Sequence, residues 1–177
     1  MTEVWLQSNR RVLLLSLIPV GALGAVGGGL LATAESTPVR AVAWGFIGLA
    51  CILLVGLIDQ LRRPRIAYRD GQVLFTIRAG RPAAVPVAVV EAFFLGQGPA
   101  HLPALGGKLP ETVNLIARLS QKAPEYARLP VKPALGAWCD GYVTIRGTWC
   151  ERLDNEVIRR LNRRLRELHD AGKAVAE

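Results

Sequence analysis

Two uncharged stretches decide how this chain is organised: VLLLSLIPVGALGAVGGGLLATA at positions 12–34 and AVAWGFIGLACILLVGLI at positions 41–58. As helices rising 1.5 Å per residue, they extend roughly 34 and 27 Å, close to the ~30 Å hydrocarbon core of a bilayer. The sequence therefore predicts two membrane spans joined by a short loop. The fold class expected is an α+β membrane protein.

The spans divide the chain into an N-terminal part, residues 1–61, and a polar domain, residues 62–170, followed by a frayed tail at 171–177. Residues 1–11 are expected to be a polar lead in which Trp5 anchors the chain at the lipid headgroups. The chain carries a net charge of +8. A basic domain beside a bilayer meets anionic lipid first and nucleic acid only secondarily, so nucleic acid is a disfavoured partner.

The positions of basic residues around the spans predict a topology. Positive charge gathers before the first span and after the second, which favours two cytoplasmic termini and a multi-pass protein of the inner (plasma) membrane. The basic residues are Arg10, Arg11, Arg40, Arg62, Arg63 and Arg65. An alternative is a secretory signal peptide cleaved after the small residues 32–34, but the apolar run exceeds the usual signal length.

Small residues recur along one face of each span and predict close packing of the two helices, because small side chains let backbones approach within lipid. The predicted contact residues are Gly21, Gly24, Ala25, Gly28 and Ala32 in the first span and Ala41, Gly45 and Gly48 in the second. The same faces suit pairing with another subunit, which is the alternative. The spans hold no ionisable residue, which argues against an ion pathway.

Beyond position 65 the pattern changes to antiparallel strands. Asp70-Gly71 and Asp140-Gly141 each separate two apolar runs and predict tight hairpin turns. Other strands are expected at 83–87, 89–95, 112–120 and 126–131. The Gly- and Pro-rich segment 96–110, around His101, is expected to be a loop.

The last element is predicted to be an amphipathic helix at about 153–169, capped by Asp154 or Glu151. Its apolar stripe, expected to pack on the sheet, is Leu153, Val157, Leu161, Leu165 and Leu168. Its other face is a candidate contact for a partner or an anionic surface, or else a solvated helix face. The arginines on that face are Arg159, Arg160, Arg163, Arg164 and Arg166.

This layout resembles a group of small bacterial membrane proteins that have two N-terminal spans and a pleckstrin-homology-like (PH-like) domain. The resemblance rests on Pro64-Arg65-Ile66, on residues 69–74, on residues 85–91, and on the closing strand and helix at 142–168. It implies an antiparallel β-barrel capped by the C-terminal helix. It supplies no catalytic residue.

The sequence lacks the common catalytic and nucleotide-binding motifs, and neither His101 nor His169 has a second ligand at metal-binding spacing. Cys139 and Cys150 form no CxxC pair. We therefore expect no enzyme activity, metal or cofactor. Two functions remain: a non-enzymatic module at the cytoplasmic membrane face that binds a partner protein, itself or the leaflet, or a tethered nucleic-acid or protein binder acting through the arginine face.

Overall fold

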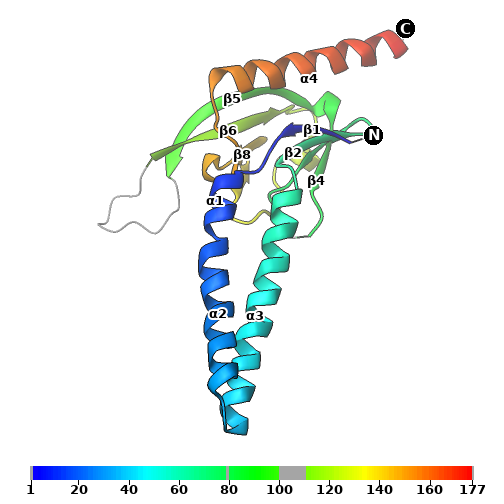
Figure 1. Ribbon diagram of the computed structural model, residues 1–177. Coiled ribbons are helices and arrows are strands. Elements are labelled where there is room, and N and C mark those ends of the chain that lie inside the picture. The colour runs from blue at the N-terminus through cyan, green and yellow to red at the C-terminus, as the bar shows by residue number, and fades with distance from the viewer. Residues whose placement is uncertain (1, 79, 100–110, 177) are drawn as a thin grey trace. The chain divides into compact units, whose positions relative to one another are not determined.

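The computed structural model describes residues 2–78, 80–99 and 111–176. The chain is α+β and divides into two compact units, coloured along the sequence in Figure 1. One unit is a helical hairpin, Asn9–Arg63, and the other joins Met1–Ser8 to Pro64–Glu177. The first eight residues thus belong to the β unit, and the expectation that they form a polar lead to the spans is wrong.

The hairpin consists of α1 (Arg10–Leu15), α2 (Leu17–Thr33) and α3 (Thr37–Arg62). The Asn9 side chain caps α1 by accepting hydrogen bonds from the backbone nitrogens of Arg11 and Val12. Two stretches, Arg10–Thr33 and Thr37–Arg62, are long and apolar enough to cross a membrane. Both predicted spans are therefore present as helices.

The face on which α2 meets α3 differs from the predicted one. Gly27, Ala43 and Ala50 are buried, and a Cβ added at Gly27 would lie 2.9 Å from Ile47 Cγ1. Of the predicted contacts, Gly24 lies on this face, since a Cβ there would lie 3.7 Å from Ala50 Cβ. The remaining predicted contact residues are exposed and lie off this interface: Gly21, Ala25, Gly28, Ala32, Ala41, Gly45 and Gly48.

Spacing explains this correction. Gly24 and Gly27 are three residues apart, and Ala43 and Ala50 seven apart, which is the repeat of a left-handed helix crossing. The predicted faces followed four-residue steps, as in right-handed GxxxG crossings. The small residues outside the interface remain open to the surroundings of the hairpin.

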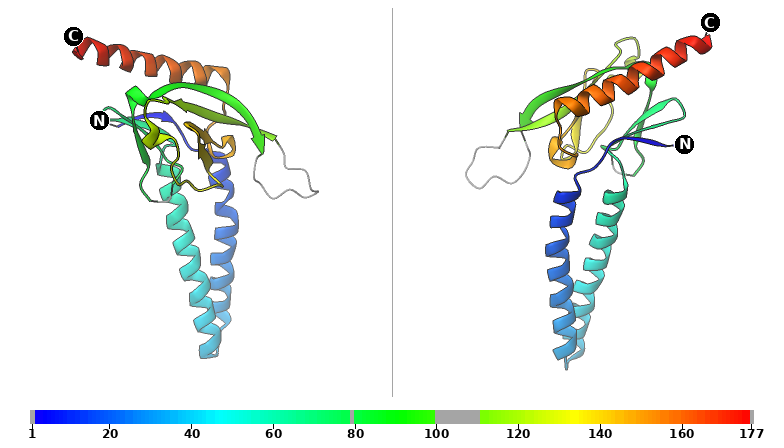
Figure 2. Two further views of the ribbon diagram at one scale, coloured as in Figure 1. Left: turned by 180° about the vertical axis from the view of Figure 1, so that it is seen from behind. Right: turned by 45° about the horizontal axis from the view of Figure 1, so that its top comes forward.

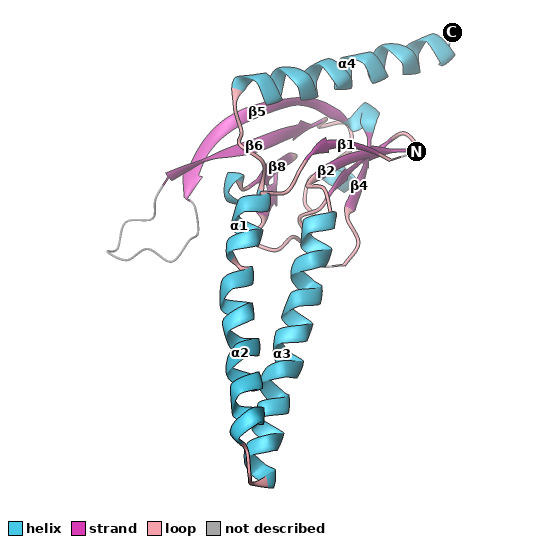
Figure 3. Ribbon diagram, in the orientation of Figure 1, coloured by secondary structure: helices cyan, strands magenta, loops and turns pink. Residues whose placement is uncertain are grey.

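The β unit contains two four-stranded antiparallel sheets, shown in magenta in Figure 3. The first has the order β1-β2-β3-β4 and the second the order β5-β6-β8-β7. The strands of the first are β1 (Glu3–Leu6), β2 (Ile66–Arg69), β3 (Gln72–Phe75) and β4 (Ala83–Pro86). Those of the second are β5 (Val90–Pro99), β6 (Glu111–Leu119), β7 (Gly136–Cys139) and β8 (Tyr142–Ile145). The described strands therefore form two sheets and not one closed barrel.

Several predicted boundaries need correction. The two Asp-Gly turns are confirmed, with all four residues at positive φ. Strand β5 continues through Pro99, so 96–99 is strand and not loop, while His101 lies outside the described residues. In place of a strand at 126–131 there is a 3₁₀ turn, Pro124–Tyr126. Helix α4 (Asn155–Ala176) extends well into the expected tail.

One apolar core lies between the two sheets and α4. Its α4 residues are Val157, Leu161 and Leu165, as the stripe predicted, and Leu153 and Leu168 pack against its margin. The strands contribute Leu6, Ile66, Phe75, Phe93, Leu115, Val143 and Ile145, among others. Burying side chains of this size contributes roughly 1.5–3 kcal/mol each, so the α4 stripe is a substantial part of what stabilises the unit.

Helix α4 lies along β5, as both views in Figure 2 show. The Asn162 side chain replaces a neighbouring strand at this sheet edge: its Oδ1 accepts from Phe93 N at 2.8 Å, and its Nδ2 donates to Phe93 O at 2.9 Å. Both backbone groups of Phe93 are thereby paired by one side chain, which fixes the register of α4 against β5.

Candidate functional site

The five arginines of α4 are positioned by a well-defined helix start. The Asp154 carboxylate accepts a hydrogen bond from Val157 N at 2.9 Å, which confirms Asp154 as the cap. With Val157, Leu161 and Leu165 buried beneath, the helix cannot rotate without exposing them. The arginines therefore have fixed directions, and they separate into two groups.

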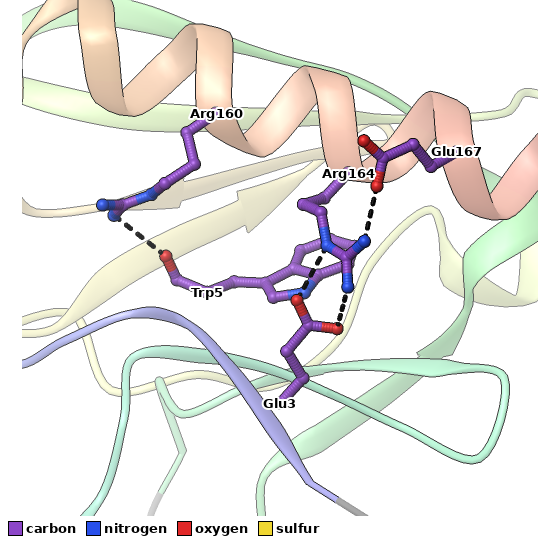
Figure 4. Close-up of polar contacts among 5 residues, drawn as sticks. All are labelled: Glu3, Trp5, Arg160, Arg164 and Glu167. Carbon is purple, nitrogen blue, oxygen red and sulfur yellow. Dashed lines mark hydrogen bonds and ion pairs between the residues drawn. The ribbon is translucent and has the colours of Figure 1, made fainter.

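Arg164 belongs to the group that holds the β unit together. Its Nε and Nη2 each donate to a Glu3 carboxylate oxygen at 2.8 Å, and its Nη1 donates to Glu167, as Figure 4 shows. The hydrogen bond from Arg164 is the main cause of a lowered pKa for Glu3, and the hydrogen bonds that Arg164 donates to Glu3 and Glu167 raise the pKa of Arg164. This bidentate pair joins α4 to β1.

Arg160 makes a second link from α4 to β1. Its Nη2 donates to the Trp5 carbonyl oxygen at 3.3 Å and to Glu151 Oε1 at 2.9 Å. Glu151 Oε1 in turn accepts from Gln7 N at 3.4 Å. Arg160, which the sequence placed on the solvated face, therefore takes part in a network inside the β unit (Figure 4).

Trp5 lies beneath these two arginines. Its side chain is 4% exposed, stacks on Tyr68 with centroids 5.7 Å apart, and meets Phe93 edge-on at 6.2 Å. Within the described structure its indole nitrogen has no hydrogen bond of normal geometry, but it lies beside Glu3 and helps to lower the pKa of that carboxyl. Trp5 is thus a core residue, which overturns its assignment as a headgroup anchor.

Arg159, Arg163 and Arg166 form the second group, which we call the arginine stripe. All three are exposed, and none forms an ion pair with a carboxylate in residues 2–78, 80–99 and 111–176. The one printed contact of Arg166 is a hydrogen bond from Nε to the Asn162 carbonyl oxygen within the helix. Spacings of four and three residues put the three guanidinium groups on one side of α4.

An open hollow of about 430 Å³ adjoins the start of the stripe. Its lining residues are Asp154, Glu156, Val157, Arg159, Arg160 and Arg163. The two acidic side chains lie at the start of the helix and the three arginines follow them, and all five of these ionisable side chains are exposed.

The buried ionisable groups of the β unit have structural partners. Arg65 is 1% exposed and donates to the carbonyl oxygens of Trp149 at 3.0 Å and Thr76 at 3.4 Å. Burial lowers the pKa of Arg65 and raises the pKa of the nearby Cys150 thiol to about 12. A thiol held neutral in this way is a poor nucleophile.

The other candidate groups are dispersed. Cys139 is exposed and Cys150 is buried, and neither is in a disulfide. His169 Nε2 lies 2.9 Å from the Val87 carbonyl oxygen. Among the described residues, no three His, Cys, Asp or Glu side chains are grouped closely enough to hold a metal ion.

No protein-family model matches the chain, and neither a curated protein nor a solved structure matches it. The arrangement of α4 and its partners is therefore what bears on function. Three residues are central to this arrangement: Glu3 and Trp5, which contact α4, and Asn162, which lies within α4. No sequence pattern singled them out for this role. Glu3 and Trp5 alternate with Thr2 and Val4 as in a half-buried strand, but four residues are too few for that signal to stand out.

Proposed function

We propose that this protein is a membrane-anchored, non-enzymatic binding module whose β unit presents the arginine stripe to an acidic surface of a partner protein. The observation that carries the proposal is the division of the α4 arginines. Arg160 and Arg164 are paired within the β unit, whereas Arg159, Arg163 and Arg166 have no carboxylate partner in the part of the chain that the structure describes. Unpaired guanidinium groups in a row attract carboxylates.

The anchor would be the helical hairpin, with both termini in the cytoplasm. Strand β1 precedes the hairpin and β2 follows it, and the two strands are hydrogen-bonded neighbours. Both ends of the hairpin must therefore leave a bilayer on the same side, which requires an even number of crossings. The distribution of arginines around the spans favours the cytoplasmic side. Cleavage after residue 34 would remove β1 with Trp5 and Leu6 from the core, so an uncleaved hairpin is favoured.

The antiparallel sheets, the Asp-Gly turns and the final helix also support a PH-like domain as the scaffold. In this proposal α4 both closes the core and carries the contact surface. Because Leu161 and Leu165 hold the helix in place, the backbone under the stripe needs no ordering at binding, and only the arginine side chains lose freedom.

Acidic protein is the partner that the charges favour. The stripe spans about 10 Å of helix, and exposed carboxylates of Glu156 and Asp170 lie beyond its two ends. These acids repel an extended polyanion such as nucleic acid or a strongly anionic leaflet, but they leave room for a few well-placed carboxylates. The stripe fits one turn or two of an acidic helix.

The test compares two triple charge reversals in the full-length protein in detergent. One replaces Arg159, Arg163 and Arg166 with Glu, and the control replaces the exposed Arg78, Arg81 and Arg128 with Glu. Binding is measured to a labelled Glu-rich helical peptide, to vesicles containing anionic lipid and to duplex oligonucleotide. We expect peptide binding to be lost only in the stripe variant. Equal loss in both variants, or binding only to vesicles or only to oligonucleotide, would overturn the proposal.

A further inference from the structure

Strand β5 is an edge strand that α4 covers over only part of its length. Asn162 pairs both backbone groups of Phe93, so these groups point away from β6. Alternate residues of a strand direct their backbone groups to the same side, so the N–H and C=O of Leu95 and Gln97 point to this free edge as well. Within the described residues nothing hydrogen-bonds to them there.

This part of the edge lacks the usual protection against pairing. Proteins commonly guard free edges with charged side chains, proline or a covering element. Residues 92–98 carry no charge, Pro99 comes only at the end of the strand, and the described hydrogen bonds of α4 to this edge are at Phe93. Within residues 2–78, 80–99 and 111–176, four backbone groups of this edge therefore lack a partner and are available to another strand.

We infer that this edge pairs with the same edge of a second copy of the chain, in antiparallel fashion about a two-fold axis at Gly96. Leu95 then lies opposite the partner's Gln97, and Gln97 opposite the partner's Leu95. Each of these pairs exchanges two hydrogen bonds, so every free group is used. The second sheet would continue from one copy into the other through β5.

The two neighbouring registers each leave backbone groups of β5 without a partner. An axis at Leu95 sets Gln97 opposite the partner's Phe93, whose backbone groups are already bound by Asn162. An axis at Gln97 sets Leu95 opposite the partner's Pro99, which has no N–H to donate. Gly96 is thus the centre that satisfies both Leu95 and Gln97.

The side chains are complementary in this register. Phe94 is on the outer face of the sheet and 41% exposed. It would lie opposite the partner's Gly98 in a closely spaced, non-hydrogen-bonded pair. An aromatic ring covering a cross-strand glycine is a recognised stabilising arrangement in sheets, and the two-fold axis provides it twice.

A second copy suits this edge better than a strand of another protein. The edge is complementary to itself, and two-fold pairing closes without leaving a new free edge. Three residues of strand bury far less than the ~1,600 Å² of a standard interface, so the contact needs a high local concentration. The anchoring proposed above supplies it, since chains confined to a bilayer meet at raised effective concentration.

The experiment uses the full-length protein reconstituted in lipid vesicles at a range of protein concentrations in the bilayer, because confinement there raises the local concentration. Gln97→Pro removes one edge N–H and leaves the β6 ladder intact, while Gln97→Ala keeps the N–H and is the matched control. Energy transfer between donor-labelled and acceptor-labelled chains gives the monomer–dimer equilibrium, and amide exchange reports on Leu95. We expect a dimer with a protected Leu95 amide for the parent and the alanine variant. For the proline variant we expect a dissociation constant raised at least tenfold and a fast-exchanging Leu95 amide.

A monomeric parent at all concentrations would overturn the inference, as would a dimer that Gln97→Pro leaves unchanged. Should the proline variant fail to fold, Phe94→Ala decides: this exposed residue can be truncated without opening the core, and the dimer should weaken several-fold. If a monomeric variant still binds the Glu-rich peptide, loss of edge pairing leaves the function of the arginine stripe intact. The two proposals are therefore tested separately.

Discussion

Helices α2 and α4 differ in how much of their surface is buried and in what buries it. Helix α4 buries Leu161 and Leu165 and turns its arginines outward, so one face is fixed by many apolar contacts. Helix α2 is apolar on all sides, and Gly27 is its one buried residue. For a helix of that kind, the face is decided by where two backbones approach most closely. The effect of a substitution on stability should therefore depend on side-chain polarity and burial in α4. In α2 it should depend on how closely the backbone of α3 approaches.

The largest effect expected is at the centre of the α4 stripe. Leu161 is 1% exposed, and Leu161→Ala should lower the free energy of unfolding by about 2–5 kcal/mol because it opens a cavity. The matched variant Arg159→Ala, two residues away on the exposed face, should change it by less than about 0.5 kcal/mol. Thermal unfolding in detergent, followed by the fluorescence of buried Trp5 and Trp138, measures both. If Leu161→Ala and the parent unfold at the same temperature, α4 is not part of the core.

In α2 the contrast should appear between adjacent glycines. A side chain at Gly27 meets Ile47 Cγ1, Phe46 Cβ and the Ala43 carbonyl oxygen, so Gly27→Leu should separate the helices at a cost of about 1–3 kcal/mol. A Cβ added at Gly28 would meet no atom of the described residues outside its own helix backbone within 4 Å, so Gly28→Leu should be tolerated.

A disulfide between cysteines at positions 24 and 50 reports on this contact, with Cys51 replaced by alanine. The two Cβ positions are 3.7 Å apart, which suits a disulfide. Cross-linking should proceed with Gly28→Leu and fail with Gly27→Leu. If Gly28→Leu blocks it instead, the helices meet on the face that the sequence predicted.

Asn162 is the polar residue on which the position of α4 along β5 depends. Asn162→Ala leaves Phe93 N–H and C=O without partners, which should cost about 1–3 kcal/mol. Amide exchange at Phe93 should accelerate while exchange in β8 stays slow. The exposed Asn155→Ala is the control, and comparable destabilisation by both changes would mean that the Phe93 contact contributes little.

The smallest effect expected is at the ion pair between α4 and β1. The pKa of Glu3 is lowered in the folded protein, so its contribution is complete above the ordinary value of 4.5 and is lost as pH falls through the lowered pKa. Because the pair is half exposed, Glu3→Gln should cost only about 0.5–1 kcal/mol at neutral pH. Melting curves from pH 7 to 3 should converge for variant and parent, whereas the exposed Asn155→Ala, which changes no ionisable group, should keep a constant offset from the parent.

Periodic patterns explain what the sequence predicted correctly. The stripe from Val157 to Leu165, the two Asp-Gly turns and the two long apolar helices all repeat a local signal over several residues or require a special backbone conformation. Such signals depend on neighbours along the chain and can be recognised without knowing the fold.

The remaining features depend on residues distant in sequence. Strand β1 has four residues, and only its pairing with β2 across the hairpin makes it a strand. The division of the α4 arginines depends on Glu3 and Glu151, which no helical periodicity involves. The face of α2 was predicted one residue away from the observed contact because several glycines offered equivalent faces.

The pairing of β1 with β2 also orders events during biosynthesis. Leu6 precedes its strand partner Ile66 by about 60 positions, so at roughly 5–20 residues per second it waits some seconds for that partner to be made. In the proposed membrane topology, the β unit closes only when both ends of the hairpin emerge on one side of the bilayer. A chain inserted with a single crossing would keep Trp5 and Leu6 uncovered and exposed to quality-control proteases. Under that topology, burial of Trp5 requires that both spans have been inserted.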